Sequence, residues 1–557
     1  MSGPKEPERV VLFAARSATA LHRLLDVLPV FEGDERLVRR FTLVPGSDFD
    51  ADALAALDAA RVSATPWAEA LKTTHALILA AGPKGELHRL RGPLLLLPHG
   101  AGFNKSLPGE GTPGRASGLD PAYLLHDGAP LAALYALAHP GQAARLAQDC
   151  PQLAARTAVV GDPTLDRMLE STGLRERYRA ALGTGERTLV VLASTWGPRS
   201  LLETRPALPA DLARELPVDT YQFAVIAHPN AHSDPGTLDL AERLPPEVLL
   251  AGPRQEWAAL LVAADVVLCD HGSAALYAAA LDRPVLSGAD GAGELLPGTP
   301  MARLLDGVPR YTGPGQLAEA GGLPAEARAA ADDAFTARGH ALDLLREQAY
   351  RLLGLPPPGP APQPRLLPVP TAPAPPPAAH AVRVTVVDGN MVRVERRPAA
   401  TGVPSHHLAA EEDAAHARHA GTAGLLYRRA GAGPREPGVA WTAAGWTAHA
   451  LGAYPACRTA AVVLTPEVCV VRRRGREGLL TVRVAPATAG GRVVRPDPAA
   501  ALSAVHARLA DAPGTADFRC LIGHHTHAVR VEPATAYEAA AELAPRHEAA
   551  AARPAAP

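Results

Sequence analysis

The stretch that decides the fold is residues 265–286, DVVLCDHGSAALYAAALDRPVL. Its first apolar run, 265–269, has the length and composition of a buried strand, and 274–281 is an alanine-rich segment typical of a short helix. A second apolar run, 284–286, follows directly. This order of strand, turn, helix and strand predicts one βαβ unit of a parallel sheet.

The same alternation occurs in two successive sets before residue 354. The first set of predicted strands is 10–14, 41–44, 76–79, 94–98 and 158–160, and the second is 188–193, 222–227, 247–250, 265–269 and 284–286. Helical stretches such as 51–60 lie between them, and a long one within 325–353 ends at Gly354. The fold class predicted is therefore α/β, with a pair of Rossmann-type lobes meeting across a cleft.

A proline-rich segment at 356–377, PPPGPAPQPRLLPVPTAPAPPP, divides the chain. Proline at this density favours extended polyproline II, a semi-rigid spacer, with an SH3-type ligand as the functional alternative. We predict an N-terminal lobe at 1–175, a second lobe at 176–354, a linker at 355–379, a small α+β domain at 380–540 and a disordered tail at 541–557. In the α+β domain, 381–387 and 391–396 form a predicted hairpin through Asp388-Gly389-Asn390, and 462–472 with 479–484 a second pair.

Composition restricts the function. The net charge of −2 over 557 residues, with both signs interspersed, argues against nucleic acid as a partner. Five scattered cysteines fit a reducing cytoplasm, and we expect no signal peptide. No uncharged apolar stretch approaches the ~18–20 residues of a membrane span, so we expect a cytoplasmic protein with at most peripheral contact at the inner face of the membrane.

Four junctions place polar residues just after predicted strands, where ligands bind in open α/β sheets. His99 and Gly100 follow 94–98, with Lys105 as a cation suited to phosphate. Asp270, His271, Gly272 and Ser273 follow 265–269, and Ser273 is the expected N-cap of a helix whose first amides favour an anion. Thr195 follows 188–193, and His228 follows 222–227. Each residue alone has a structural alternative, as a loop cap or an ordinary turn.

Taken together, these motifs resemble the CDP-glycerol glycerophosphotransferase family, teichoic-acid-polymerase-like proteins of the GT-B glycosyltransferase superfamily. The block from Asp270 to Ser273, continued to Pro284, is similar to the family's Asp-Tyr-Ser-Ser block. His99-Gly100 with Lys105 is similar to its His-Gly-Thr-Pro-Leu-Lys motif, with one extra residue. Ser194-Thr195-Trp196 and His228-Pro229 are similar to its Thr-Trp and His-Pro motifs. The resemblance covers about residues 90–290.

The resemblance implies an inverting transferase of cell-envelope type that moves glycerol phosphate or a sugar from a CDP- or UDP-type donor to a hydroxyl acceptor. His99 is then the catalytic residue, acting on the acceptor hydroxyl. The donor-binding residues implied are Thr195, His228, Asp270, His271, Gly272 and Ser273, while Gly100 and Lys105 contact phosphate or acceptor. Neither a metal nor another cofactor is expected.

Three departures from the family pattern keep alternatives open. Tyr277 replaces the block's second acidic residue, His271 its tyrosine and Gly197 the arginine after Thr-Trp, and His271-Gly272-Ser273 is also similar to the His-Gly-Gly turn of nucleotide-sugar glycosyltransferases. The donor is therefore either CDP-glycerol or a nucleotide sugar. A catalytically degenerate binding or scaffold protein, and a nucleotide-sugar epimerase, are the alternative functions.

The C-terminal domain is rich in histidine. His416 with His419, and the run from His524 to His527, are candidate metal ligands, but no cysteine or carboxylate stands at a matching spacing. We therefore expect no metal there. The basic run at 472–476 is interpreted as a hairpin tip that exposes charge to water.

Overall fold

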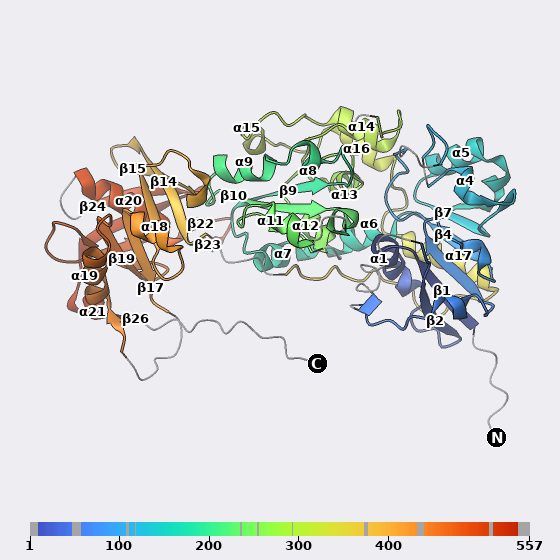
Figure 1. Ribbon diagram of the computed structural model, residues 1–557, viewed down its shortest axis with the longest axis horizontal. Coiled ribbons are helices and arrows are strands. Elements are labelled where there is room, and N and C mark those ends of the chain that lie inside the picture. The colour runs from blue at the N-terminus through green and yellow to red at the C-terminus, as the bar shows by residue number, and fades with distance from the viewer. Residues whose placement is uncertain are drawn as a thin grey trace, which may run out of the picture.

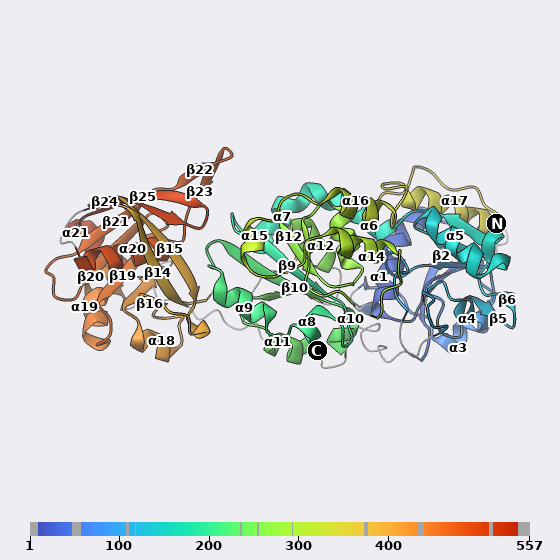
Figure 2. The same cartoon turned by 90° about the horizontal axis from the view of Figure 1, so that it is seen from above.

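The protein consists of three units in a row: a first lobe, a second lobe and a C-terminal domain, with the second lobe in the middle (Figure 1). A view from above shows the same order (Figure 2). This computed structural model describes residues 9–46, 57–58, 60–106, 111–116, 118–233, 237–252, 256–291, 293–371, 377–431, 439–511 and 516–543.

The first lobe is built on a six-stranded parallel sheet in the order β2-β1-β3-β4-β7-β8. Its strands are β1 (Arg9–Ala15), β2 (Leu37–Leu43), β3 (Leu77–Ala81), β4 (Leu94–Leu97), β7 (Leu134–Leu137) and β8 (Thr157–Val159). Helices α1 (Ala18–Val27) and α5 (Pro140–Asp149) pack on it, and α3 (Trp67–Ala70), α4 (Pro121–Leu124) and the ribbon β5 (Leu125–His126) with β6 (Ala129–Pro130) lie in its connections. Strand β7 was not predicted, and most of the helix predicted at 51–60 lies outside the described residues.

The second lobe contains a five-stranded parallel sheet in the order β11-β10-β9-β12-β13. Its strands are β9 (Thr188–Ser194), β10 (Tyr221–Ala227), β11 (Leu249–Leu250), β12 (Val266–Cys269) and β13 (Val285–Ser287). Its helices are α6 (Pro163–Glu170), α7 (Arg175–Ala181), α8 (Leu201–Thr204), α9 (Leu208–Glu215), α10 (Pro229–Ser233), α11 (Thr237–Glu242), α12 (Glu256–Ala263), α13 (Ala274–Ala280), α14 (Pro300–Gly307), α15 (Gly315–Ala318) and α16 (Ala325–Asp332). The two parallel, helix-covered sheets confirm the prediction of Rossmann-type lobes.

The end of the helical stretch at 325–353 belongs to the first lobe. The stretch breaks after α16, and α17 (Ala341–Leu353) lies against the first lobe (Figures 1 and 2). Its Leu345 and Tyr350 side chains join the core of the first sheet with Phe13 and Phe31. Gly354 ends α17 in a left-handed conformation, as predicted. The predicted boundary assigned α17 to the second lobe and is wrong there, because an apolar helix stripe does not identify the sheet that it covers.

The C-terminal domain is a closed barrel wrapped around a helix. Its nine strands are β14 (Ala379–Asp388), β15 (Met391–Pro398), β24 (Ala516–Ile522), β25 (His525–Pro533), β21 (Leu480–Val484), β20 (Val468–Arg473), β19 (Thr459–Thr465), β17 (Leu425–Arg429) and β16 (His407–Glu411), in this order around the barrel. Helix α20 (Pro498–Asp511) fills the interior of the barrel. Residues 499–505 are at most 1 % exposed, so this part of the helix is covered on all sides, and it shares one apolar core with the strands.

Outside the barrel, α19 (Ala443–Ala453) covers strands β17, β19 and β20 with Trp446 in the apolar contact. Smaller elements are α18 (Ala417–Thr422), α21 (Ala536–Ala539), β18 (Trp441–Thr442), β22 (Ala487–Ala489), β23 (Arg492–Val494) and β26 (Glu542–Leu543). The hairpin of β14 and β15 was predicted, but 462–472 is not one strand, because it turns between β19 and β20. The α+β prediction therefore left out the closure of the barrel.

The proline-rich segment lies along both lobes as a strap, defined here as residues 356–371. Arg36 of the first lobe donates to the Pro356 carbonyl at 2.9 Å, and Tyr178 of the second lobe donates to the Leu367 carbonyl at 2.9 Å. The Leu367 side chain is 4 % exposed within the core of the second lobe. Residues 356–371 form neither helix nor strand, and up to Thr371 the segment is bound to the lobes and is not a free spacer.

A buried ion cluster joins the barrel domain to the second lobe. Arg396 of β15 pairs with Asp219 of the second lobe at 2.6 Å and with Asp497 of its own domain at 2.8 Å. The Val218 amide also donates to the Arg396 carbonyl at 2.9 Å. Both carboxylates raise the pKa of Arg396 above its usual value despite the desolvation that burial imposes. The barrel domain is therefore docked through a charged, largely dehydrated contact.

Candidate functional site

The predicted donor residues gather at the carboxyl edge of the second sheet. Strands β9 and β12 are neighbours, and the chain leaves them in opposite directions, toward β10 on one side and β13 on the other. Such a switch point leaves a crevice in which α/β proteins bind ligands. Thr195 follows β9 and Asp270 follows β12, so both stand at this crevice.

Asp270 is fully buried and ties the two loops of the crevice together. One carboxylate oxygen accepts from the amides of Thr195 at 2.8 Å and Leu201 at 2.7 Å. The other accepts from the Gly272 amide at 2.8 Å. Because both oxygens are engaged within the protein, direct contact of Asp270 with a donor would compete with these bonds.

The His271-Gly272-Ser273 turn faces the first lobe. His271 is 1 % exposed, and its Nε2 lies 2.8 Å from a carboxylate oxygen of Glu294. Burial and the charge of Lys105 lower the pKa of His271, while Glu294 opposes the shift. Ser273 precedes α13, but its side chain makes no capping hydrogen bond, so the predicted cap is wrong in this detail.

His99 follows β4 after Pro98 and precedes Gly100, which approaches this turn. The His99 ring reaches solvent, yet the walls of the cleft crowd it; this crowding, with the positive charges of Arg23 and Lys84, lowers the pKa of His99 to about 4. With its pKa lowered, the imidazole is neutral at pH 7 and able to accept a proton. The adjacent Gly100 approaches Ser273 so closely that a Cβ there would lie 3.5 Å from the Ser273 hydroxyl.

Lys105 links the two lobes across the cleft. Its ammonium donates to the Thr195 hydroxyl at 3.1 Å. The loop that carries it is bound to the second lobe, because the Leu296 amide donates to the Asn104 carbonyl at 2.9 Å and the Ser106 amide to the Glu294 carbonyl at 3.0 Å. Burial lowers the pKa of Lys105, and the charges of Asp270 and Glu294 oppose this shift.

His228 closes the crevice on the β10 side. Its amide donates to the Ser194 carbonyl at 3.0 Å, and its Nδ1 accepts from the Asn230 amide at 3.2 Å. In the neutral ring the proton then belongs on Nε2. The Trp196 ring lies 6.3 Å away, centroid to centroid. The structure thus brings all nine predicted site residues to the facing edges of the two lobes.

Sequence reasoning missed a buried triad behind this site. Arg23 of α1 contacts both oxygens of Asp162, at 2.8 and 2.9 Å, and donates to the Tyr277 hydroxyl at 2.8 Å. Arg23 and Asp162 are at most 4 % exposed, and Tyr277 belongs to α13 of the second lobe. The triad braces the lobes against each other. Its only sequence signal is Asp162-Pro163, a helix start that indicates nothing about its partners.

A second missed feature is a cavity of about 390 Å³ in the first lobe; its lining includes Pro83, the neighbour of Gly82, which lies close to the His99 ring. It lies at the switch point of the first sheet, between Arg16 after β1 and Lys84 after β3. The stacked rings of His88 and His126, 3.7 Å apart, form another wall. Among the described residues, the lining includes Arg16, Lys84 and these two histidines but no carboxylate, so the cavity favours an anion.

Two pairs of histidines lie close together in the C-terminal domain: the ring centroids are 4.4 Å apart for His407 and His506 and 6.3 Å apart for His416 and His419. His524 contacts the Thr188 hydroxyl at 3.3 Å, His525 lies 3.9 Å from Glu186, and His527 contacts the Ala485 carbonyl at 3.1 Å. Across the described ranges, no three histidine, cysteine or acidic side chains come together in a way suited to a metal ion. Nor does any helix in these ranges combine the length and apolar character needed to cross a bilayer.

Comparison with known proteins found likeness in structure alone. No protein-family model and no curated protein matches the sequence. The wall teichoic acid polymerase TagF is 14% identical over 63% of this chain and 90% of its own, with a TM-score of 0.45. UDP-GlcNAc 2-epimerase from Neisseria meningitidis, bound to UDP-GlcNAc, is 12% identical over 61% of this chain and 100% of its own, with a TM-score of 0.44.

Proposed function

We propose that the protein is a GT-B-type transferase that moves glycerol phosphate or a sugar from a CDP- or UDP-type donor to a hydroxyl acceptor. One observation carries the proposal: the loop after β4 that contains His99, Gly100 and Lys105 meets the second lobe at its switch point, where Gly100 lies against the Ser273 side chain and Lys105 donates to the Thr195 hydroxyl. A proton acceptor, a cation and hydroxyl groups gathered at one cleft are the groups that a transfer from a diphosphate requires.

On the donor wall, the contact residues are Lys105, Thr195, His228 and Ser273. The Lys105 ammonium neutralises phosphate charge, and the hydroxyls with the Nε2 proton of His228 supply hydrogen bonds. Asp270 and His271 position the site without contacting the donor. Asp270 fixes the amides of Thr195 and Gly272, and Glu294 holds the His271 ring. No metal is required for this set of contacts, because Lys105 provides the positive charge.

On the acceptor wall, the 390 Å³ cavity of the first lobe receives the acceptor. Its cationic lining without a carboxylate selects a hydroxyl compound that also carries a phosphate or carboxylate group. In the reaction, His99 takes the acceptor's hydroxyl proton as the oxygen attacks the donor. The bond to the leaving nucleotide breaks, UDP departs from a sugar donor or CMP from CDP-glycerol, and Lys105 offsets the negative charge that develops.

Turnover tests this proposal. Purified protein is incubated with CDP-glycerol or a UDP-sugar and hydroxyl acceptors with and without a phosphate group, and the released nucleotide is quantified. We expect release that depends on an acidic acceptor and falls ~10²–10⁴-fold in His99→Gln. His449→Gln, on the exposed surface of the barrel domain, is the matched control.

A non-catalytic binding protein of the same fold is the second candidate. The observation that favours it is that the polar groups of the crevice already have partners within the protein. Both carboxylate oxygens of Asp270 accept from backbone amides, and Lys105 donates to Thr195. It predicts that a donor binds without release of nucleotide and that His99→Gln changes nothing.

A further inference from the structure

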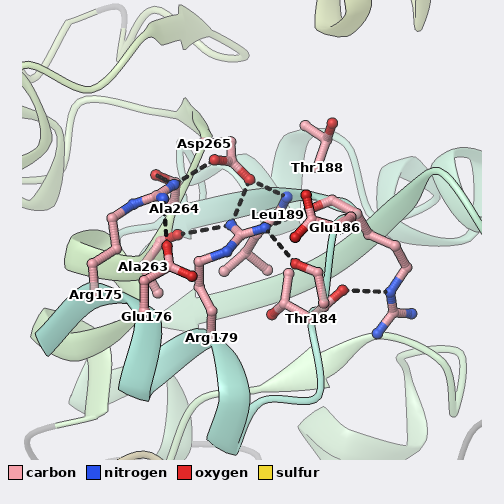
Figure 3. Close-up of polar contacts among 12 residues, drawn as sticks. Arg175, Glu176, Arg179, Thr184, Glu186, Thr188, Leu189, Ala263, Ala264 and Asp265 are labelled. Atoms are coloured by element: carbon pink, nitrogen blue, oxygen red, sulfur yellow. Dashed lines mark hydrogen bonds and ion pairs between the residues drawn. The ribbon is translucent and has the colours of Figure 1, made fainter. Parts of the chain in front are cut away.

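A cavity of about 280 Å³ lies where the barrel domain meets the second lobe. The second lobe contributes α7, the turn at 185–188 and Asp265, and the barrel domain contributes Arg492 of β23 and His524 of the turn between β24 and β25. Figure 3 shows the lobe side, where Arg175, Arg179 and Asp265 are linked by hydrogen bonds.

This cavity is separate from the transfer cleft. Thr188 begins β9 and Asp265 immediately precedes β12, so the cavity is at the amino edge of the second sheet. The cleft residues Thr195 and Asp270 follow the carboxyl ends of the same strands. At ~3.3 Å per residue, the seven residues of β9 place the two edges about 20 Å apart.

Positive charge is in excess around the cavity. Its lining contains four guanidinium groups and three carboxylates, with the imidazole of His524 in addition: Arg175, Arg179, Arg187 and Arg492 against Glu176, Glu186 and Asp265. An anion would balance this set. The recurring use of arginine matches phosphate, whose oxygens accept two parallel hydrogen bonds from one guanidinium.

Each carboxylate already has an arginine partner. Asp265 accepts from Arg175 and, at 2.7 Å, from Arg179, with the Leu189 amide at 2.8 Å as a third donor. The barrel's Arg492 pairs with Glu176 at 2.8 Å and Glu186 at 3.1 Å. These pairs explain how the domains adhere, but they leave Arg187 out.

Arg187 is the lining arginine for which the described part of the chain provides no ion-paired carboxylate. Its guanidinium donates to the carbonyls of Thr184 at 3.0 Å and Gly183 at 2.5 Å, and no carboxylate among the described residues lies within ion-pair distance of it. Burial lowers the pKa of Arg187. The negative charge of Asp219 raises this pKa, whereas the positive charges of Arg179 and Arg396 lower it further. A bound anion would relieve this accumulation of positive charge.

We propose that this interdomain cavity binds a small phosphate-bearing molecule through Arg187 and Arg492. Its volume is below the ~300–1,000 Å³ of typical drug-sized ligand sites, so the occupant is inorganic phosphate, pyrophosphate or a small phosphorylated metabolite. Because the lobe supplies Arg187 and the barrel domain supplies Arg492, the ligand bridges the two and tightens their docking. The inference is independent of the proposed transfer reaction.

Hydrogen–deuterium exchange of the full chain in a phosphate-free chloride buffer tests the proposal, with pyrophosphate, inorganic phosphate and glycerol 3-phosphate as separate ligands. We expect protection of the peptides around 183–189 and 490–495 at millimolar ligand. The ligand that protects at the lowest concentration identifies the source of the phosphate. Protection should require ~10-fold or more ligand in Arg187→Gln and in Arg492→Gln.

Arg530→Gln is the matched control, because Arg530 is an exposed barrel arginine paired with Asp517 at 3.3 Å. Arg492 is 58% exposed, so its substitution tests binding even if Arg187→Gln disturbs the fold. Three results would overturn the proposal: no protection with any of the ligands, protection confined to the cleft peptides 194–202 and 228–233, or equal protection in both cavity variants.

Discussion

The Lys105 ammonium of the first lobe donates a hydrogen bond to the Thr195 hydroxyl of the second lobe at 3.1 Å. This contact joins the two walls of the cleft at the point where a donor phosphate is proposed to bind. Lysine is scarce in this chain, with only four residues, and arginine supplies nearly all other positive charge. Because a lysine ammonium is a compact charge on a flexible stem, Lys105 is able to change its hydrogen-bond partner from the Thr195 hydroxyl to a phosphate oxygen.

Replacing Lys105 with methionine should weaken binding of the donor nucleotide by roughly 10- to 100-fold. The substitution retains the apolar stem but removes a charged hydrogen bond worth ~1.5–3 kcal/mol. Isothermal titration with the donor nucleotide measures the effect. Lys72→Met, at an exposed position of the first lobe, is the control; affinities equal to wild type in both variants would contradict the phosphate role of Lys105.

Asp270→Asn should destabilise the second lobe by about 2–3 kcal/mol. The asparagine NH₂ group would replace one acceptor oxygen and leave at least one buried amide, of Thr195, Leu201 or Gly272, without its partner. Chemical denaturation followed by circular dichroism gives the change in the free energy of unfolding. Asp282→Asn, 65% exposed in its side chain, should change it by less than ~0.5 kcal/mol; similar values for both variants would argue against the bracing role.

Arg396→Met should release the barrel domain from the second lobe. The substitution leaves the buried carboxylates of Asp219 and Asp497 without their shared partner, at a cost of about 3–5 kcal/mol. Small-angle scattering should then show a larger radius of gyration. Arg393→Met changes an exposed arginine of the same strand and should leave the scattering curve unaltered. A compact Arg396→Met protein would mean that other contacts hold the domain.

The barrel domain should lose stability in mild acid. Burial lowers the pKa of His380 and His407 to about 3 and that of His506 to about 4, against 6.5 for an unperturbed histidine. Between pH 6.5 and 4 the unfolded chain therefore binds protons that the folded domain does not, so stability is full above pH 6.5 and falls as the pH drops.

Urea unfolding followed by fluorescence of the buried Trp446 measures this effect at pH 7.5 and pH 5. We expect a lower midpoint at pH 5 and a smaller difference in His407→Asn, which removes one of the titrating rings. Equal midpoints at the two pH values would contradict the prediction. The exposed His449→Asn serves as the control for loss of a histidine.

Much of the two lobes follows from the sequence, because continuous apolar runs such as 188–193 and 222–227 have few alternatives to buried parallel strands. Strand β7 escaped prediction since Leu134–Leu137 is followed by His139-Pro140, which interrupts the apolar run. Packing across long sequence distances was also out of reach. The apolar face of α17 fits either sheet, and periodicity contains no information about which one it covers.

The barrel illustrates the same limit. Short strands and a hairpin at Asp388-Gly389-Asn390 were predicted, but closure depends on the pairing of β14 with β16 and of β15 with β24, whose residues are far apart in sequence. For the cleft, the position of each residue after a strand predicted that it would lie at the sheet edge. The partners were not predictable: Glu294 for His271, or the amides around Asp270, because loop contacts leave no periodic signal. The roles assigned to these residues stay predictions.

The most direct test of the central claim is equilibrium binding of nucleotides to the cleft. A thermal-shift series with CDP, UDP, GDP and dTDP, and with their sugar or glycerol conjugates, is measured on the wild type, Thr195→Val, His228→Ala and Arg492→Gln. The account predicts that a cytidine or uridine diphosphate raises Tm by mass action, that the rise is lost in Thr195→Val and His228→Ala, and that it is retained in Arg492→Gln. If no nucleotide shifts Tm at millimolar concentration, the cleft is not a donor site and the transferase proposal is wrong.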